Sequence, residues 1–196
     1  MMSTTLRALG VVALLGGAAC SSSGAAGNRV ETRPFTQEMS RDFDDGADYI
    51  ENVEDLGGRV AADWRSAIDR LARAADFIAV VHVETLTGSD DAASSRAYRL
   101  SSRIVGAPLH GAAPRDGLID LRVEEGQGGY NTIRSNYTRL QARNFLLFAR
   151  YYTDSEGAVR PHWHLTPDTR AAQQRARDAL GLVDPNAPTE TIVRTN

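Results

Sequence analysis

The hydrophobic pattern of the chain changes from helical to strand-like spacing near residue 76. Before that point, apolar residues recur every three or four positions in two segments, which is the spacing of an amphipathic helix. The first segment predicts a helix from Thr36 to the Gly57–Gly58 pair, and the second predicts a helix to about Ala74. The apolar positions are Met39, Phe43, Ile50 and Val53 in the first segment, and Val60, Trp64, Ile68 and Leu71 in the second.

Five later segments have the composition or the alternation of β-strands. The last two of them flank the turn signal at 154–157 and predict a hairpin, with Pro161 at an edge or a bulge. Helical spacing returns between the third and fourth strands, and again from Thr166 to about Leu180. The predicted strands are residues 77–86, 96–105, 118–124, 145–152 and 158–165, and the intervening helix is 130–140.

Three strands, a helix and two further strands follow one another in residues 76–165. This order resembles the OB-fold, a five-stranded and partly open Greek-key barrel. The resemblance implies an α+β fold: a five-stranded OB-like antiparallel β-barrel with N-terminal helices, a helix between strands three and four, and a C-terminal helix. The region enters its first strand at Ala75-Asp76 and also resembles netrin-type modules, which implies inhibition of a secreted protease as an alternative function. In such inhibitors a disulfide-anchored N-terminal cysteine chelates the protease metal, and this chain has a single cysteine.

The first 20 residues have the pattern of an export signal. Arg7 precedes a short apolar run that ends in Gly17-Ala18-Ala19-Cys20, and about 20 apolar residues would be needed to span a bilayer. The run resembles a bacterial lipobox, although that family usually has Leu where Gly17 stands. The resemblance implies cleavage before Cys20 and covalent lipid on that cysteine as the only attached group. Ser21 then favours the outer membrane over the inner membrane.

This interpretation divides the chain into four parts. Residues 1–19 form the signal peptide and residues 20–35 form a flexible tether, because they contain few apolar residues. Residues 36–181 form one α+β domain with its OB-like core at 76–165. Residues 182–196 form a disordered tail that contains two prolines.

The charge balance restricts the class of partner. All 22 basic residues are Arg, against 25 acidic residues, and the formal net charge is −3. A protein without a basic surplus lacks the electrostatic footprint of a nucleic-acid-binding protein. We therefore expect no nucleic-acid partner. The expected contacts are the membrane, through the lipid anchor, and another envelope protein or polymer.

Three histidines are the candidate metal ligands. His162 and His164 alternate with Trp163, so both imidazoles point to one face of the last strand, and His82 in the first strand would supply a third ligand. This set would make the protein a metal-dependent envelope enzyme. The alternative is that both side chains belong to the ordinary polar face of a strand whose other face is apolar.

The acid-rich segment 42–55 does not match a calcium loop. With Gly46 at the invariant sixth position, the first, third and twelfth positions become Arg41, Phe43 and Asn52. We expect the acids to form a solvated helix face. Motifs for a serine nucleophile, a phosphate loop and a zinc protease are also absent from the sequence.

The expected function is therefore that of a lipid-anchored envelope lipoprotein that acts as a non-catalytic binding or structural module. Its expected rims are the Asp90–Asp91 loop, the segment 126–130 and the series Arg134, Arg139 and Arg143.

Overall fold

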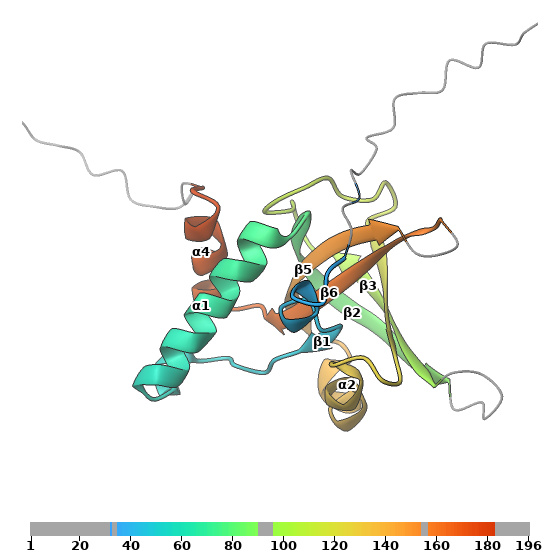
Figure 1. The fold of residues 1–196 in the computed structure, drawn as a ribbon, viewed down its shortest axis with the longest axis horizontal. Helices are drawn as coiled ribbons and strands as arrows, with labels where there is room; N and C mark the ends of the chain where they lie inside the picture. The colour runs from blue at the N-terminus through green and yellow to red at the C-terminus, as the bar shows by residue number, and fades with distance from the viewer. Residues whose placement is uncertain (1–31, 33–34, 90–95, 154–156, 183–196) are drawn as a thin grey trace, which may run out of the picture. The chain divides into compact units, whose positions relative to one another are not determined.

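A computed structural model describes residues 32, 35–89, 96–153 and 157–182 (Figure 1). They form one six-stranded sheet in the order β1-β6-β5-β2-β3-β4. The pairing of β1 with β6 is parallel and all other pairings are antiparallel. The strands are β1 (Gly46–Ala47), β2 (Phe77–Ser89), β3 (Ala97–Ile104), β4 (Leu118–Glu124), β5 (Asn144–Thr153) and β6 (Val159–Pro167).

The helices lie at two places around this sheet. The α-helices are α1 (Gly58–Ala74), α2 (Tyr130–Ser135), α3 (Tyr137–Leu140) and α4 (Arg170–Ala179), and the 3-10 helices are η1 (Met39–Arg41) and η2 (Val53–Asp55). Helices α1 and α4 lie side by side against one face, and α2 lies across the other end of the sheet next to β1 (Figure 1).

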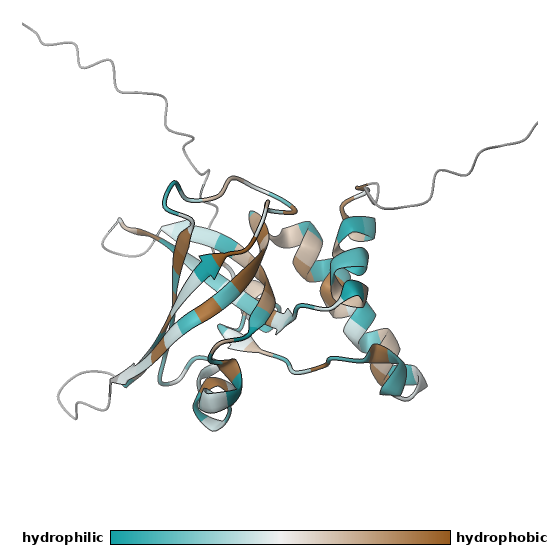
Figure 2. Ribbon diagram, turned by 180° about the vertical axis from the view of Figure 1, so that it is seen from behind, coloured by the Kyte–Doolittle hydropathy of each residue, from teal (hydrophilic) through white to brown (hydrophobic). Residues whose placement is uncertain are grey.

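The curled sheet separates two hydrophobic cores. The concave core is built from alternate residues of all the long strands, with Trp163, Phe145 and Leu121 at its centre and Ile133 of α2 at its end. The second core lies between the convex face and helices α1 and α4, where Phe148 and Ile78 of the sheet contact Ile68 and its neighbours. Polar residues cover the outer surface of α4 (Figure 2).

Local sequence explains the two long helices. The buried residues of α1 recur every three or four positions, which places them on the face that packs on the sheet. At the start of α4, the Oγ1 atom of Thr169 accepts a hydrogen bond of 3.1 Å from the backbone N–H of Ala172. The buried residues of α4 are Ala172 and Ala176, whose small side chains permit close approach to α1.

The predicted α+β class and its five strands are confirmed, but the predicted five-stranded OB-like barrel is matched only roughly. The sheet has a sixth strand, β1, and it remains a curled half-barrel because no ladder joins β4 to β6 in the described residues. Only a side chain crosses there: the Nε1 atom of Trp163 donates a hydrogen bond of 3.1 Å to the backbone oxygen of Arg122. We call the gap between the facing edges of β4 and β6 the seam.

The predicted helix from Thr36 is also wrong, and its own polar side chains explain why. The carboxylates of Asp44 and Asp48 accept hydrogen bonds from the N–H groups two residues later, at 3.2 and 3.0 Å, and Asn52 does the same for Glu54. Such local bonds compete with helical hydrogen bonding. The segment instead forms η1, β1 and η2, and it covers the outer face of β6.

The predicted helix at 130–140 is present but broken. It consists of α2 and α3, which meet at Asn136. The Nδ2 atom of Asn136 donates to the backbone oxygen of Thr132 at 2.9 Å, so the side chain occupies a carbonyl of the helix that ends there.

Within the described residues, no helix has the length and apolar character needed to cross a membrane.

Candidate functional site

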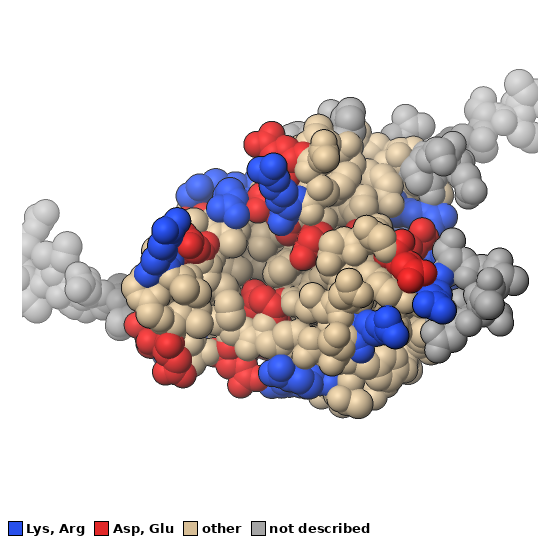
Figure 3. Space-filling view, turned by 60° about the horizontal axis from the view of Figure 1, so that its bottom comes forward, with Lys and Arg blue, Asp and Glu red and all other residues tan. Residues whose placement is uncertain are grey.

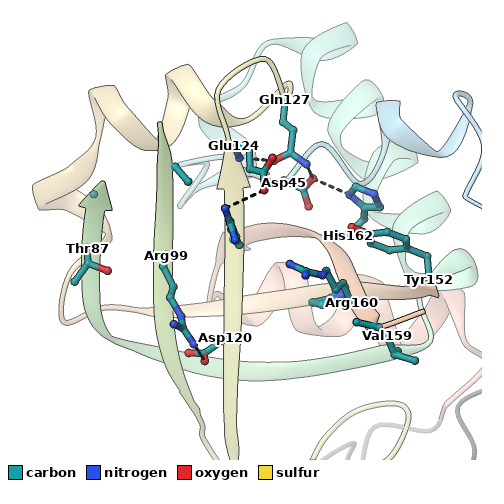
Figure 4. A pocket seen from close by; sticks show the side chains of 15 residues that line it. Asp45, Thr87, Arg99, Asp120, Glu124, Gln127, Tyr152, Val159, Arg160 and His162 are labelled. Atoms are coloured by element: carbon teal, nitrogen blue, oxygen red, sulfur yellow. Dashed lines mark hydrogen bonds and ion pairs between the residues drawn. The ribbon is translucent and has the colours of Figure 1, made fainter. Parts of the chain in front are cut away.

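A hollow in the described molecule lies along the seam. This groove has a volume of about 950 Å³, which is within the range of ligand sites, and it receives residues from both edges of the open sheet (Figure 4). From the β4 side it is lined by Thr87, Gly88, Ala97, Arg99, Asp120, Arg122 and Glu124, and from the β6 side by Tyr152, Val159, Arg160, Pro161 and His162. Asp45 and Gln127 lie at one end.

The charges that line the β4 side of this groove are paired with one another. Arg99 contacts Asp120, and the guanidinium of Arg122 lies 3.2 Å from the Glu124 carboxylate. These side chains are about half exposed, so their pairing adds little stability in water. The pairing matters for ligand recognition, because this wall of the groove carries no excess of positive or negative charge. Arg and acidic side chains also alternate over the face of the molecule seen in Figure 3.

A buried aspartate closes one end of the groove. Asp45 accepts hydrogen bonds from Gln127 Nε2 at 3.0 Å, from the Trp163 backbone N–H at 3.1 Å and from His162 Nδ1 at 2.7 Å. We call these four residues the Asp45 clamp. It joins β6 to the turn after β4, where the Oε1 atom of Gln127 accepts the Glu124 N–H.

The Asp45 clamp requires an unusual backbone. Asp45 has a φ of 57°, in the left-handed region, and only 2% of its surface is exposed. Burial raises the pKa of its carboxyl above 3.8, although the hydrogen bond and charge of His162 lower it. Gly129 lies against this turn, and a Cβ atom there would be only 2.2 Å from the Asp45 carbonyl oxygen. The clamp is therefore built by tight contact between two backbones.

His162 is fixed on the groove wall by aromatic contacts. Its ring stacks on Phe35 and on Tyr152, with centroid distances of 3.7 and 4.3 Å, and the Phe35 and Tyr152 rings lie 5.8 Å from each other. An ionised carboxylate only accepts hydrogen bonds, so the Nδ1 atom of His162 is the donor in its contact with the Asp45 carboxylate. The close-up in Figure 4 shows Asp45, His162 and Tyr152 on the groove wall.

His164 lies two residues further along β6 and makes a separate ion cluster. Its Nδ1 atom is 2.9 Å from Asp44 and its Nε2 atom is 3.5 Å from Asp48. Both ring nitrogens therefore face carboxylates, which favours the doubly protonated, charged ring. Burial lowers the pKa of His164, but the hydrogen bonds and charges of Asp44 and Asp48 outweigh burial and raise it to about 9.

The structure does not bring the three predicted metal ligands together. His162 and His164 contact different aspartates, and His82 bonds to Asn144 at 2.8 Å. By strand register His164 lies opposite Phe148, which lies opposite Ile78, four residues from His82 along β2. Among the described residues, no group of three or more His, Cys, Asp or Glu could hold a metal ion.

The expectation of solvated polar faces is wrong at this point. The side chains of His162 and His164 are only 14% and 16% exposed, because the acid-rich segment covers them. Sequence reasoning therefore did not identify Asp44, Asp45 and Asp48 as the partners of the two histidines. The sequence contains an acidic turn, D-D-G-A-D, and a histidine pair, H-W-H, and these two motifs are complementary in charge. That complementarity is the signal that could have suggested their pairing.

The predicted rims have mixed positions. The segment 126–130 reaches the groove through Gln127, whereas Arg139 lies over the Tyr49 ring and Arg143 pairs with Glu51. Neither arginine lines the groove. The Asp90–Asp91 loop and Cys20 lie outside the described residues.

Comparisons with protein-family models, with curated protein sequences and with solved structures gave no match. The site is therefore interpreted from its own geometry.

Proposed function

We propose that this protein is a lipid-anchored component of the bacterial cell envelope that binds another envelope component in the groove along the seam, without catalysis. The observation that carries the proposal is the groove itself. It has a volume of about 950 Å³, and two unjoined strand edges flank it. The anchor is the lipid that the lipobox resemblance places on Cys20, and it would hold the domain at the membrane surface.

The arrangement of polar groups around the groove supports binding over chemistry. The Asp45 carboxylate and the Nδ1 atom of His162 are committed to the clamp, and the His162 ring also stacks on Phe35 and Tyr152. Within the described residues, no hydroxyl or thiol forms a hydrogen bond to His162, as a serine or cysteine nucleophile paired with its base would.

The proposal is tested by filling the groove in the native lipoprotein. Thr87→Trp places a large ring on the groove wall, and Val60→Trp adds the same ring on exposed α1, away from the groove. We expect crosslinking in intact cells, followed by mass spectrometry, to recover an envelope component with the wild type and with Val60→Trp. We expect Thr87→Trp to lose it. Equal recovery from both variants would contradict binding in the groove.

The anchor is tested separately. Cys20→Ala should move the protein from the membrane fraction to the soluble fraction and should also abolish recovery of the partner. A Cys20→Ala protein that stays in the membrane fraction would contradict the lipid anchor but not the groove.

A further inference from the structure

We infer that the groove takes an extended peptide segment of a partner protein, which adds to the sheet as a strand along the β4 edge of the seam. This inference rests on the proposed binding function and specifies the chemistry of its partner. It follows from the backbone groups that the curled sheet leaves at the two edges.

The outward edge of β4 can be derived from its hydrogen bonds to β3. The Gly117 carbonyl accepts from Ile104, and the Glu125 N–H donates to Arg96, so odd-numbered residues of β4 face β3. The backbone groups of even-numbered residues therefore point into the seam. In agreement, the Arg122 carbonyl accepts the Trp163 indole N–H.

Part of this outward edge is already satisfied and part is not. Glu124 bonds to Gln127 through both backbone groups, and the Leu118 N–H donates to Asp116. Within the described chain, four outward groups have no hydrogen-bond partner: the Leu118 carbonyl, the Asp120 N–H and carbonyl, and the Arg122 N–H. Alternating donors and acceptors over five residues, a span of about 17 Å, are what an added strand recognises.

The β6 edge faces the same seam but offers fewer donors. Asp45 and Asp48 contact the backbone of Trp163 and Leu165, so odd-numbered residues of β6 point outward. Pro161 is one of them, which confirms its predicted edge position and removes one N–H. An incoming strand would therefore be held mainly by β4, with the Pro161 carbonyl and Val159 on its other side.

Strand directions and charge also suit a peptide. Strands β4 and β6 run in the same direction, because four antiparallel pairings lie between them, so one inserted strand can be antiparallel to both. The Trp163–Arg122 bond spans the seam at one end. The β4 wall carries ion pairs with no excess charge, which disfavours a highly charged polymer relative to a polypeptide backbone.

The first test is photo-crosslinking from the two sides of the seam in the full-length lipoprotein. Leu118 and Val159 are exposed at the starts of β4 and β6, and Val60 on α1 is a control at least as exposed as either. With a photoreactive residue at each position, we expect Leu118 and Val159 to label one short segment of one partner, and Val60 not to label it. Labelling of a glycan would overturn the peptide inference while leaving the proposed binding function intact. Labelling of this chain itself, or of nothing from either position, would overturn it as well.

The second test asks whether the contact is made by the backbone. The probe is a synthetic peptide of the crosslinked segment, and the variants are Asp120→Pro, which removes the outward N–H, and Asp120→Ala, which keeps it. We expect Asp120→Pro to weaken binding about fivefold and Asp120→Ala to change it less than about twofold, since one hydrogen bond contributes about 1 kcal/mol. Equal losses would overturn strand addition.

A measurement on the wild type tests the same contact and does not depend on whether the proline variant folds. Amide hydrogen exchange of Asp120 and Arg122 should slow when the peptide binds, whereas Val123, which already pairs with β3, should serve as an internal reference. Unchanged exchange at Asp120 and Arg122 with saturating peptide would overturn the inference.

Discussion

The His164 cluster makes the stability of this protein depend on pH in a calculable way. The pKa of His164 is raised from 6.5 to about 9 because Asp44 and Asp48 face its two nitrogens. The folded state therefore binds a proton more tightly than the unfolded state. Stability from this proton is fully present below pH 6.5 and is lost as the pH rises through 9, and the difference amounts to about 3 kcal/mol.

Urea unfolding, followed by tryptophan fluorescence, measures this loss directly because Trp64 and Trp163 are both buried. The free energy of unfolding should fall by about 3 kcal/mol between pH 6 and pH 9.5. The pH range is favourable because all 22 basic residues other than histidine are Arg, which stays charged throughout. Burial also raises the pKa of Tyr49 to about 12, so this tyrosine does not titrate in the range.

Two variants isolate the cause. His164→Gln should flatten the pH dependence and should be less stable than the wild type at pH 6. His82→Gln removes another strand histidine, whose contact with Asn144 is exposed, and should keep the wild-type slope. A flat profile in the wild type would refute the assignment of a charged His164. A slope that persists in His164→Gln would assign the titration to another group.

Three further changes test the end of the groove. Gly129→Ala should cost several kcal/mol in urea unfolding because its Cβ would overlap the Asp45 carbonyl, whereas Gly58→Ala, with open space around it, should cost nothing. Trp163→Phe should lower the free energy of unfolding by about 1–3 kcal/mol, since the Arg122 carbonyl loses its donor, and no loss would contradict the bridging role of the indole. Asp45→Asn should destabilise the protein by about 3 kcal/mol at pH 7, because an amide cannot accept all three hydrogen bonds; a neutral effect would show that the carboxylate is not ionised there.

The strands could be predicted because each one carries its own signal. In β4, Ile119, Leu121 and Val123 are buried and alternate with exposed residues, and in β5 six consecutive residues are buried. These burial patterns are local, so they can be recognised in the sequence without knowing which strands pair with one another. Helix α1 was predictable for the same reason.

The site could not be predicted because it depends on contacts between distant segments. In the segment 36–53, Phe43 and Val53 are buried as a helix would require, yet Asp44 and Asp48 satisfy the backbone locally and prevent one. The two-residue strand β1 is too short to show an alternation of buried and exposed residues in the sequence. The groove lies where the sheet stays open, and Trp163 and the Asp45 clamp make contacts across that opening between residues far apart in the sequence.

The position of β1 beside β6 also constrains the order in which the chain folds. The hydrogen bonds from His162 to Asp45 and from His164 to Asp44 span 117 and 120 residues, so most of the domain lies between their partners. Closing so long a loop is slow and entropically costly. The hydrogen bonds between this segment and β6 therefore form only after the last strand is in place. The Asp45 end of the groove needs residues from both segments, so it cannot form before that strand.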